Sequence, residues 1–336
     1  MSAQKRSIDD NEAGDARKRA CMEDWLVQLD KQGYAVVPGV LDDAACDAAL
    51  AGLSDFFAGL GCNMNERNAL SNIHGIYQHY GIGHSRAIWD VRSAAAVAAP
   101  FERIYGTNDL LVSFDGFSLM LPQRRFAKNK WWFHMDQSAR CAGRQCVQGY
   151  VNLTDSSTDN SGSLLVLPGS HRRFGEFFEH FPAMRDKAKG DWCKLENDEQ
   201  RKFFGTEPTR VHGPRGSLVL WDSRTVHQNI GPACAPSDAQ RRCVVYVCYQ
   251  PRAWCSKADL KKKQKAFAEY RMTTHWPALK VRLFPEHPRT YGAPPTVPVP
   301  KHRDRVDTER MLELAGVTPM RSAPVVVRTP ALAFNK

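Results

Sequence analysis

The chain has 336 residues, of which 43% are hydrophobic and 24% charged, a composition typical of a folded protein with a sizeable core. No stretch approaches the roughly 18 uninterrupted apolar residues of a membrane span, and the N-terminus is polar and charged, unlike a secretion signal. The 10 cysteines are scattered without a C-x-x-C pair. We therefore expect an intracellular protein with reduced thiols and no membrane segment.

The formal net charge of +10 is concentrated near the C-terminus. Residues 257–336 carry 16 Lys and Arg against 7 Asp and Glu, so the rest of the chain is almost neutral. A solvated basic helix and tail explain such a distribution more simply than a nucleic-acid partner does. The charge therefore supports a nucleic-acid partner only weakly, and it does not reveal the oligomeric state.

The N-terminal residues 1–20 are poor in apolar side chains and predict a disordered tail. Two basic clusters in it, Lys5-Arg6 and Arg17-Lys18-Arg19, have the spacing of a bipartite nuclear-import signal. We expect a cytoplasmic or nuclear location.

The next part of the chain predicts supporting helices. A helix is expected over residues 22–33, a strand over 34–40, a second helix from the N-cap Asp42 towards Gly61, and a third over 90–105. His74, His79 and His84 lie five residues apart, which fits neither a helix face nor a strand face, and they predict loop or surface histidines.

From Leu110 onward the pattern changes to short strands separated by Gly, Pro, Asn and Asp, which is typical of a β-sandwich or jelly roll. Strands are expected over residues 110–114, 117–121, 131–136, 146–153, 163–167, 217–221 and 242–249. Residues 172–207 predict an inserted helical or loop segment, and this segment and residues 62–88 are expected to gate a pocket.

The last eighty residues predict a basic helix over 257–273, a short helix over 308–315 and a Pro-rich extension, because 10 of the 20 prolines lie between Pro277 and Pro330. The predicted organisation is therefore an N-terminal tail (1–20), a catalytic domain (21–276) and a basic, Pro-rich C-terminal extension (277–336).

Candidate metal ligands stand in the aromatic run at 131–137. His134 and Asp136 are two residues apart in a strand-like segment, where alternate side chains share a face. His227 follows another strand-like run and supplies a third ligand. Two histidines and one carboxylate form the facial triad of non-haem Fe(II) oxygenases, which leaves open positions on the metal.

Two further features point to a lined pocket near this triad. Arg241 and Arg242 open the final strand, where a guanidinium can hold a carboxylate through two hydrogen bonds. On the strand over 146–153, alternation places Gln148, Tyr150 and Asn152 on one face and apolar residues on the other. A simple solvent-facing strand would show the same alternation.

These segments together give the chain a resemblance to a known family. It resembles the phytanoyl-CoA dioxygenase-like Fe(II)/2-oxoglutarate oxygenases over roughly residues 22–276. The resemblance rests on Gly33-Tyr-Ala-Val-Val-Pro-Gly39, the His134/Asp136 pair, Tyr150-Val-Asn-Leu-Thr-Asp155, Gly162-Ser-Leu-Leu-Val-Leu-Pro-Gly-Ser-His171, Trp221-Asp-Ser-Arg-Thr-Val-His227 and Arg242-Cys-Val-Val-Tyr246.

The resemblance implies a mainly β, cupin-like double-stranded β-helix with Fe(II) on His134, Asp136 and His227. It also implies that 2-oxoglutarate binds Arg242, with Arg241 as the alternative, and that Asn229 lies near the co-substrate. Tyr150 stands where relatives often carry Trp. The implied reaction uses O2, with ascorbate as a reductant, and releases succinate and CO2. Halogenating relatives replace the carboxylate ligand, so Asp136 favours hydroxylation.

Three functions remain open from the sequence. The first is hydroxylation or oxidative demethylation of a small organic substrate. The second is the same chemistry on a nucleic acid or a protein side chain, and the third is an inactive cupin-like metal-binding module.

Overall fold

The computed structural model describes residues 25–66, 70, 74–122, 131–141, 143–188, 190–233, 237–286, 303–321 and 332–334. The predicted N-terminal tail, its basic clusters and most of the Pro-rich segment lie outside these residues. Within them, no helix is long and apolar enough to cross a membrane.

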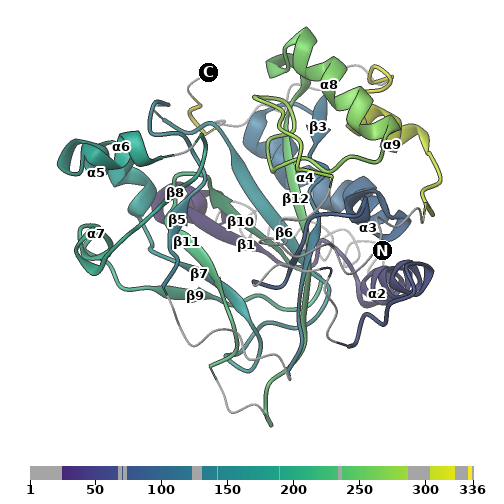
Figure 1. Ribbon diagram of the computed structural model, residues 1–336, viewed down its shortest axis with the longest axis horizontal. Helices are drawn as coiled ribbons and strands as arrows, with labels where there is room; N and C mark the ends of the chain where they lie inside the picture. Colours follow the sequence, from purple (N-terminus) through teal and green to yellow (C-terminus); the bar gives the residue numbers. More distant parts are fainter. Residues whose placement is uncertain are drawn as a thin grey trace, which may run out of the picture.

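Two antiparallel sheets form the centre of the molecule (Figure 1). The larger sheet has the order β1 (Tyr34–Val37), β10 (Leu218–Asp222), β6 (Val147–Asn152), β12 (Arg242–Pro251), β4 (Phe117–Met120) and β2 (Ile76–Tyr77), with β3 (Leu110–Val112) also paired to β12. The smaller sheet has the order β8 (Cys193–Lys194), β5 (His134–Met135), β11 (His227–Ile230), β7 (Ser163–Val166) and β9 (Thr209–Val211).

The helices form two groups on opposite sides of the sheets, as Figure 1 shows. One group contains α2 (Asp43–Gly59), α3 (Arg86–Ser93), α4 (Ala95–Tyr105), α8 (Lys257–Ala268) and α9 (Glu309–Ala315). The other contains α5 (Phe174–His180), α6 (Ala183–Lys187) and α7 (Asp198–Lys202). Residues 25–32 are also helical, and single 3-10 turns occur at Ile82–His84, Ser170–Arg173 and Arg252–Trp254.

Alternation along β12 explains how one strand serves two cores. Val245 and Val247 pack with the helices of the first group, whereas Val244 and Tyr246 lie between the two sheets. The space between the sheets is therefore lined by alternate residues of each strand, and no described ladder joins the sheets into a closed barrel. This arrangement confirms the predicted mainly β, jelly-roll class with supporting helices.

The structure corrects several local predictions. The strand expected over 131–136 is reduced to His134–Met135, and Asp136 already lies in the following loop. The helix expected over 90–105 is two helices, because Ala94 has an extended backbone (ψ 123°). His84 was expected in a loop or at the surface, but it is buried with 1% exposure.

The C-terminal region packs on the main core. Helix α9 begins after the N-cap Thr308 and ends at the left-handed Gly316, as the sequence predicted. Its residue Leu314 is fully buried in the same cluster as the helices of the first group. The division into domains at residues 21, 276 and 277 stays a prediction.

Candidate metal centre and co-substrate pocket

The register of the smaller sheet brings the three predicted metal ligands together. His134 on β5 and His227 on β11 are direct cross-strand partners, and Asp136 follows β5 by one residue. The Nε2 atom of His134 lies 3.7 Å from Asp136 Oδ1, and that of His227 lies 3.3 Å from Asp136 Oδ2. The ligand atoms of the three residues all lie within 4.8 Å of one another.

Backbone groups orient each ligand. The Nδ1 atom of His134 lies 3.2 Å from the Trp132 carbonyl, and that of His227 lies 2.9 Å from the Thr225 carbonyl. Donation from Nδ1–H to these carbonyls leaves both Nε2 lone pairs free for a metal. The backbone N–H of Asp136 donates to the Ser223 carbonyl at 2.9 Å, which fixes the loop that carries the carboxylate.

The electrostatics of the cluster favour the forms that bind a cation. Burial, with a smaller contribution from His227, lowers the pKa of His134 to about 4, so its ring is neutral at pH 7. Burial by itself would raise the pKa of Asp136, but the neighbouring His134 and His227 outweigh burial and hold that pKa below its usual value. A neutral imidazole beside an ionised carboxylate provides donors that divalent transition metals bind.

The triad lies on the wall of a cavity of about 420 Å³. Besides the triad, the lining residues include Gln148, Leu164, Trp221, Asn229 and Tyr246. They also include His74, Ile76, Gln78, Trp132, Asp191, Trp192, Thr274, His275, Trp276, Arg282 and Phe284. Both segments that were expected to gate the pocket, 62–88 and 172–207, therefore contribute to its lining.

Arg242 is a buried arginine that has no hydrogen-bond partner among the described residues. It is fully buried, and within the described chain none of its three guanidinium nitrogens finds an acceptor. The guanidinium carbon lies 4.8 Å from the centre of the Tyr150 ring. Arg242 is not itself among the cavity-lining residues, but it lies close enough to Tyr246 to oppose the rise that burial causes in the pKa of that phenol.

A buried guanidinium without acceptors is costly unless an anion completes it. Among the described residues, the unpartnered guanidinium of Arg242 fits a carboxylate, and the three triad ligands fit a divalent metal ion. The side chain of Arg241, the alternative, instead donates to exposed Asn65 at 2.7 Å.

The other predicted pocket residues have different environments. Gln148 donates to Asp136 Oδ2 at 3.2 Å, so it supports a metal ligand directly. Asn229 lines the cavity and donates to the Tyr246 hydroxyl at 3.0 Å. Tyr150 forms the surface under Arg242. The expectation for Asn152 needs correction, because its amide is used between strands, donating to the Gly213 carbonyl and the Ser217 hydroxyl, each at 3.1 Å.

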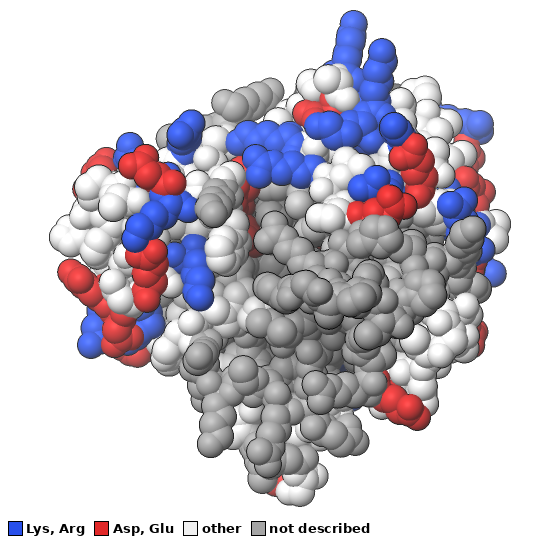
Figure 2. Space-filling view, in the orientation of Figure 1, with Lys and Arg blue, Asp and Glu red and all other residues white. Residues whose placement is uncertain are grey.

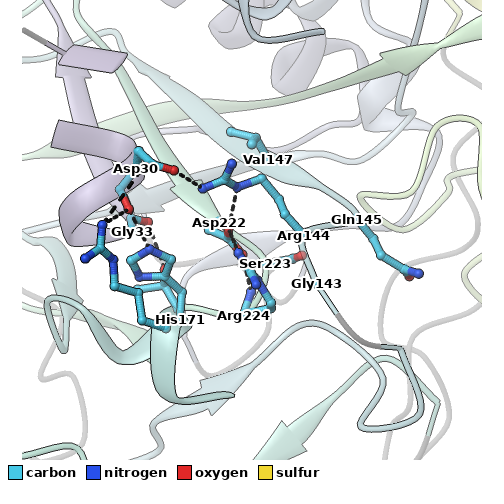
Figure 3. A network of polar contacts seen from close by, with 12 residues as sticks. Asp30, Gly33, Gly143, Arg144, Gln145, Val147, His171, Asp222, Ser223 and Arg224 are labelled. Atoms are coloured by element: carbon cyan, nitrogen blue, oxygen red, sulfur yellow. Dashed lines mark hydrogen bonds and ion pairs between the residues drawn. The ribbon is translucent and has the colours of Figure 1, made fainter. Parts of the chain in front are cut away.

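A buried ionic network supports the metal centre from behind (Figure 3). Asp222, at the end of β10, accepts from Arg144 Nε at 2.7 Å and from Arg224 Nη2 at 2.7 Å. Arg144 also reaches Asp30 at 3.1 Å. The turn that starts at Asp222 supplies the Ser223 and Thr225 carbonyls that hold Asp136 and His227.

Sequence reasoning did not single out this ionic network or the cavity-lining residues Asp191 and Trp192. Asp222 and Arg224 stand in the segment Trp221–His227 that carried the family resemblance, so their place in the motif was the available signal. Asp191 and Trp192 stand in the inserted segment, where no periodic pattern marks them.

The fold and site define a jelly-roll protein with a two-histidine, one-carboxylate candidate metal centre and a buried arginine that has no hydrogen-bond partner among the described residues. The chain belongs to the phytanoyl-CoA dioxygenase (PhyH) family, which it matches over residues 29–229. This match confirms the family that the motifs indicated.

A curated relative is the Ava biosynthesis cluster protein O from Aspergillus versicolor, with 32% identity over 206 residues, 59% of this chain. The match covers 65% of that protein, slightly less than two thirds of its length.

Similar solved structures include the epimerase SnoN in complex with Fe3+, alpha ketoglutarate and nogalamycin RO (19% identity, TM-score 0.49, 70% of this chain and 85% of that one). Another is EctD from S. alaskensis with 2-oxoglutarate and 5-hydroxyectoine (13% identity, TM-score 0.47, 68% and 75%). Similarity at this level does not identify the substrate of this chain.

Proposed function

We propose that this chain is an Fe(II)- and 2-oxoglutarate-dependent oxygenase that hydroxylates or oxidatively demethylates a small organic substrate. The observation that carries the proposal is the presence of two features that need a ligand. One is a triad of ligand atoms within 4.8 Å of one another, and the other is a buried guanidinium for which the described residues offer no acceptor. Fe(II) completes the first and the far carboxylate of 2-oxoglutarate completes the second.

When bound, iron and 2-oxoglutarate would supply the four-electron reduction of O2, in which two electrons come from the oxidative decarboxylation of 2-oxoglutarate to succinate and CO2 and two come from the hydroxylated C–H bond. The chain's own residues do the rest. His134, Asp136 and His227 hold the metal on one side, which leaves the cavity side for co-substrate and O2. Arg242 orients 2-oxoglutarate and neutralises its charge. The aromatic cavity wall excludes water from the reacting carbon.

The test of this proposal is succinate release from 2-oxoglutarate by the purified chain with Fe(II), ascorbate and air. We expect slow turnover without added substrate, and its loss in His227→Ala. The variant must show an unchanged circular dichroism spectrum, so that the loss reports the metal site.

A second measurement separates the oxygenase from the metal-binding module. Under anaerobic conditions we expect 2-oxoglutarate to bind the Fe(II) protein and produce the visible absorption band of an Fe(II)–2-oxo-acid chelate. Metal binding without any such band, together with no succinate, would favour the inactive module.

A separate proposal is that the protein is located in the nucleus. It is tested by deleting residues 1–20 and following the location of a fluorescent fusion protein in cells.

A further inference from the structure

Aromatic side chains line the cavity close to the candidate metal centre. The Trp192 ring lies 6.0 Å from the His134 ring, and the Trp132 ring stacks on His134 at 4.7 Å and on His74 at 3.9 Å. Trp192 remains 45% exposed, although large aromatic side chains are usually buried. A Trp that is exposed at the rim of an apolar cavity is suited to cover a flat ring of a bound ligand.

The same cavity wall carries polar atoms that lack hydrogen-bond partners in the described chain. The buried, unpartnered atoms of cavity-lining residues are Asp191 Oδ1 and Oδ2, Asn229 Oδ1, Thr274 Oγ1, His275 Nε2, Trp221 Nε1 and Trp276 Nε1. Three of these seven atoms accept only, two can accept or donate, and the two indole nitrogens donate only. The wall therefore offers more acceptors than donors.

Among these groups, the Asp191 carboxylate has the greatest need of hydrogen-bond donors. Its side chain is 7% exposed, and neither carboxylate oxygen accepts a hydrogen bond within the described residues. A buried carboxylate is normally held by two or more donors, because leaving its oxygens unsatisfied costs more than the burial of a neutral group. Since Asp191 faces the cavity, a ligand can supply these donors.

Two cations near Asp191 do not meet this demand. Arg282 Nη1 lies 3.4 Å and Lys280 Nζ 3.8 Å from its oxygens, without hydrogen-bond geometry. Their side chains are 50% and 40% exposed, so water solvates both cations and screens the pairs. Lys280 already donates to Cys141 Sγ at 3.1 Å. Figure 2 shows Lys and Arg side chains along the upper edge of the molecule in that view. Because Arg282 and Lys280 are also positively charged, an anionic ligand is the main alternative.

We propose that the substrate is a flat, apolar molecule that carries a basic nitrogen, with its ring against Trp192 and its N–H groups donating to Asp191. The inference rests on the proposed function only in that the oxidised carbon must lie at the triad. Thr274 and His275 provide further acceptors for a second N–H group, and Trp276 provides a donor for a carbonyl or ring nitrogen.

The test uses three probes that share a ring and differ in charge: 2-(2-naphthyl)ethylamine, 2-(2-naphthyl)ethanol and 2-naphthylacetate. Their binding to the full chain, with Fe(II) and 2-oxoglutarate under anaerobic conditions, is measured by saturation-transfer NMR and isothermal titration. A charge-assisted hydrogen bond predicts that the amine binds about 10-fold more tightly than the alcohol or better. In Asp191→Asn we expect the amine and the alcohol to bind equally.

Trp192 and Trp131 form a matched pair for the ring. Both are exposed, 45% and 52% respectively, but Trp131 is not among the residues that line this cavity. Trp192→Ala should weaken all three probes by the same factor, whereas Trp131→Ala should leave their binding unchanged. Equal effects of the two substitutions would contradict the place assigned to the ring.

A further substitution, at Arg282, tests whether the ligand carries a positive or a negative charge. Arg282→Gln removes a competing cation, and we expect the amine to bind as well as before or more tightly. If naphthylacetate binds best and loses its affinity in Arg282→Gln, the pocket takes anions and the proposal is wrong. Because these measurements need no turnover, an amine preference without succinate release would overturn the proposed function alone, and succinate release without this preference would overturn only the substrate class.

Discussion

At the scale of single residues, the sequence predicted which side chains would be the metal ligands, but not which residues would hold those ligands in place. An H-x-D pair and a distant histidine limit the chemistry, because few functions need those side chains together. The Gln148 amide on Asp136 was predicted only as a polar wall residue. Asn152 has the same polarity and the same strand face, yet it faces Gly213 and Ser217. The alternation of polar and apolar residues predicts on which face of the strand a side chain lies. It does not predict whether that side chain reaches the cavity.

The two arginines at the start of β12 give a sharp test at this scale. Arg242→Ala should raise the 2-oxoglutarate concentration needed for half-maximal succinate release by about 100-fold, since the loss of a buried charged pair costs a few kcal/mol. Iron affinity should change little. Titration of 2-oxoglutarate and of Fe(II) in parallel separates the two effects.

Arg241→Ala is the matched control, because this neighbouring residue points to exposed Asn65. Its 2-oxoglutarate requirement should stay at the wild-type value. A larger effect in Arg241→Ala than in Arg242→Ala would show that the co-substrate lies on the other face of the strand.

At the scale of elements, strands with apolar alternation were predicted well, and short or irregular elements were not. β5 has only two residues, so its pairing depends on β11 and β8 and leaves no local periodicity to read. The break between α3 and α4 occurs at Ala94, although Pro100 is the residue that sequence rules would suspect. Pro100 is the sixth residue of α4, and the helix continues through it without the hydrogen bond that an N–H there would donate to the Ala96 carbonyl.

The turn after β10 also depends on a glycine far away in sequence. Gly33 has φ +79°, and a Cβ there would lie 2.4 Å from Thr225 Oγ1 and 2.5 Å from His171 Nδ1. The Gly33 carbonyl accepts from the Asp222 N–H at 2.9 Å and the Thr225 hydroxyl at 2.8 Å. The turn that orients two metal ligands is therefore fastened to the start of β1.

The charge of Asp222 should matter for both folding and metal binding. Asp222→Asn keeps the shape but removes the anion of Arg224 and leaves Arg144 with only the half-exposed Asp30. Breaking such a buried pair costs about 3 kcal/mol. We expect a lower free energy of unfolding in urea and weaker Fe(II) binding, because the Ser223 and Thr225 carbonyls lose their fixed positions.

Asp109→Asn provides the control for this substitution. Asp109 accepts from Arg252 Nε at 2.8 Å, but the two side chains are 25% and 18% exposed and lie in the α9 region. Its loss should cost about 1 kcal/mol or less and leave Fe(II) affinity unchanged. Equal metal affinity in wild type and Asp222→Asn would show that the network stabilises the fold without positioning the ligands.

At the scale of the whole molecule, the C-terminal segment 303–321 is part of the folded body. The Arg305 guanidinium lies 3.7 Å from the centre of the Phe267 ring, and its Nη1 lies 3.2 Å from His84 Nδ1. His84 Nε2 lies 3.0 Å from the Arg271 carbonyl. This buried histidine thus joins three distant segments, and it does so as a neutral ring that donates from Nε2 and accepts at Nδ1.

Acid should therefore destabilise the protein through His84. Burial lowers the pKa of His84 from 6.5 to about 3, so between these values the unfolded chain binds a proton that the folded chain does not. Stability is full above pH 6.5 and falls as the pH decreases, by on the order of 3 kcal/mol at pH 4.

Thermal unfolding between pH 4 and 7 measures this contribution. His84→Gln should be less stable at pH 7 but show a flatter decline towards pH 4. His180→Asn, at an exposed position on α5, should keep the wild-type slope. An unchanged slope in His84→Gln would assign the acid sensitivity to other groups.

The cross-strand pairing of His134 with His227 has a consequence for synthesis of the protein. His134 and Asp136 are made almost together, but the third ligand, His227, is added much later, and β5 cannot pair with β11, the strand that carries it, until that strand is made. A growing chain that has not yet released His227 therefore lacks an assembled triad. Under the proposed function, the complete iron site forms only after β11 has emerged. Iron bound to all three ligands would therefore mark newly made chains in which β5 and β11 have paired.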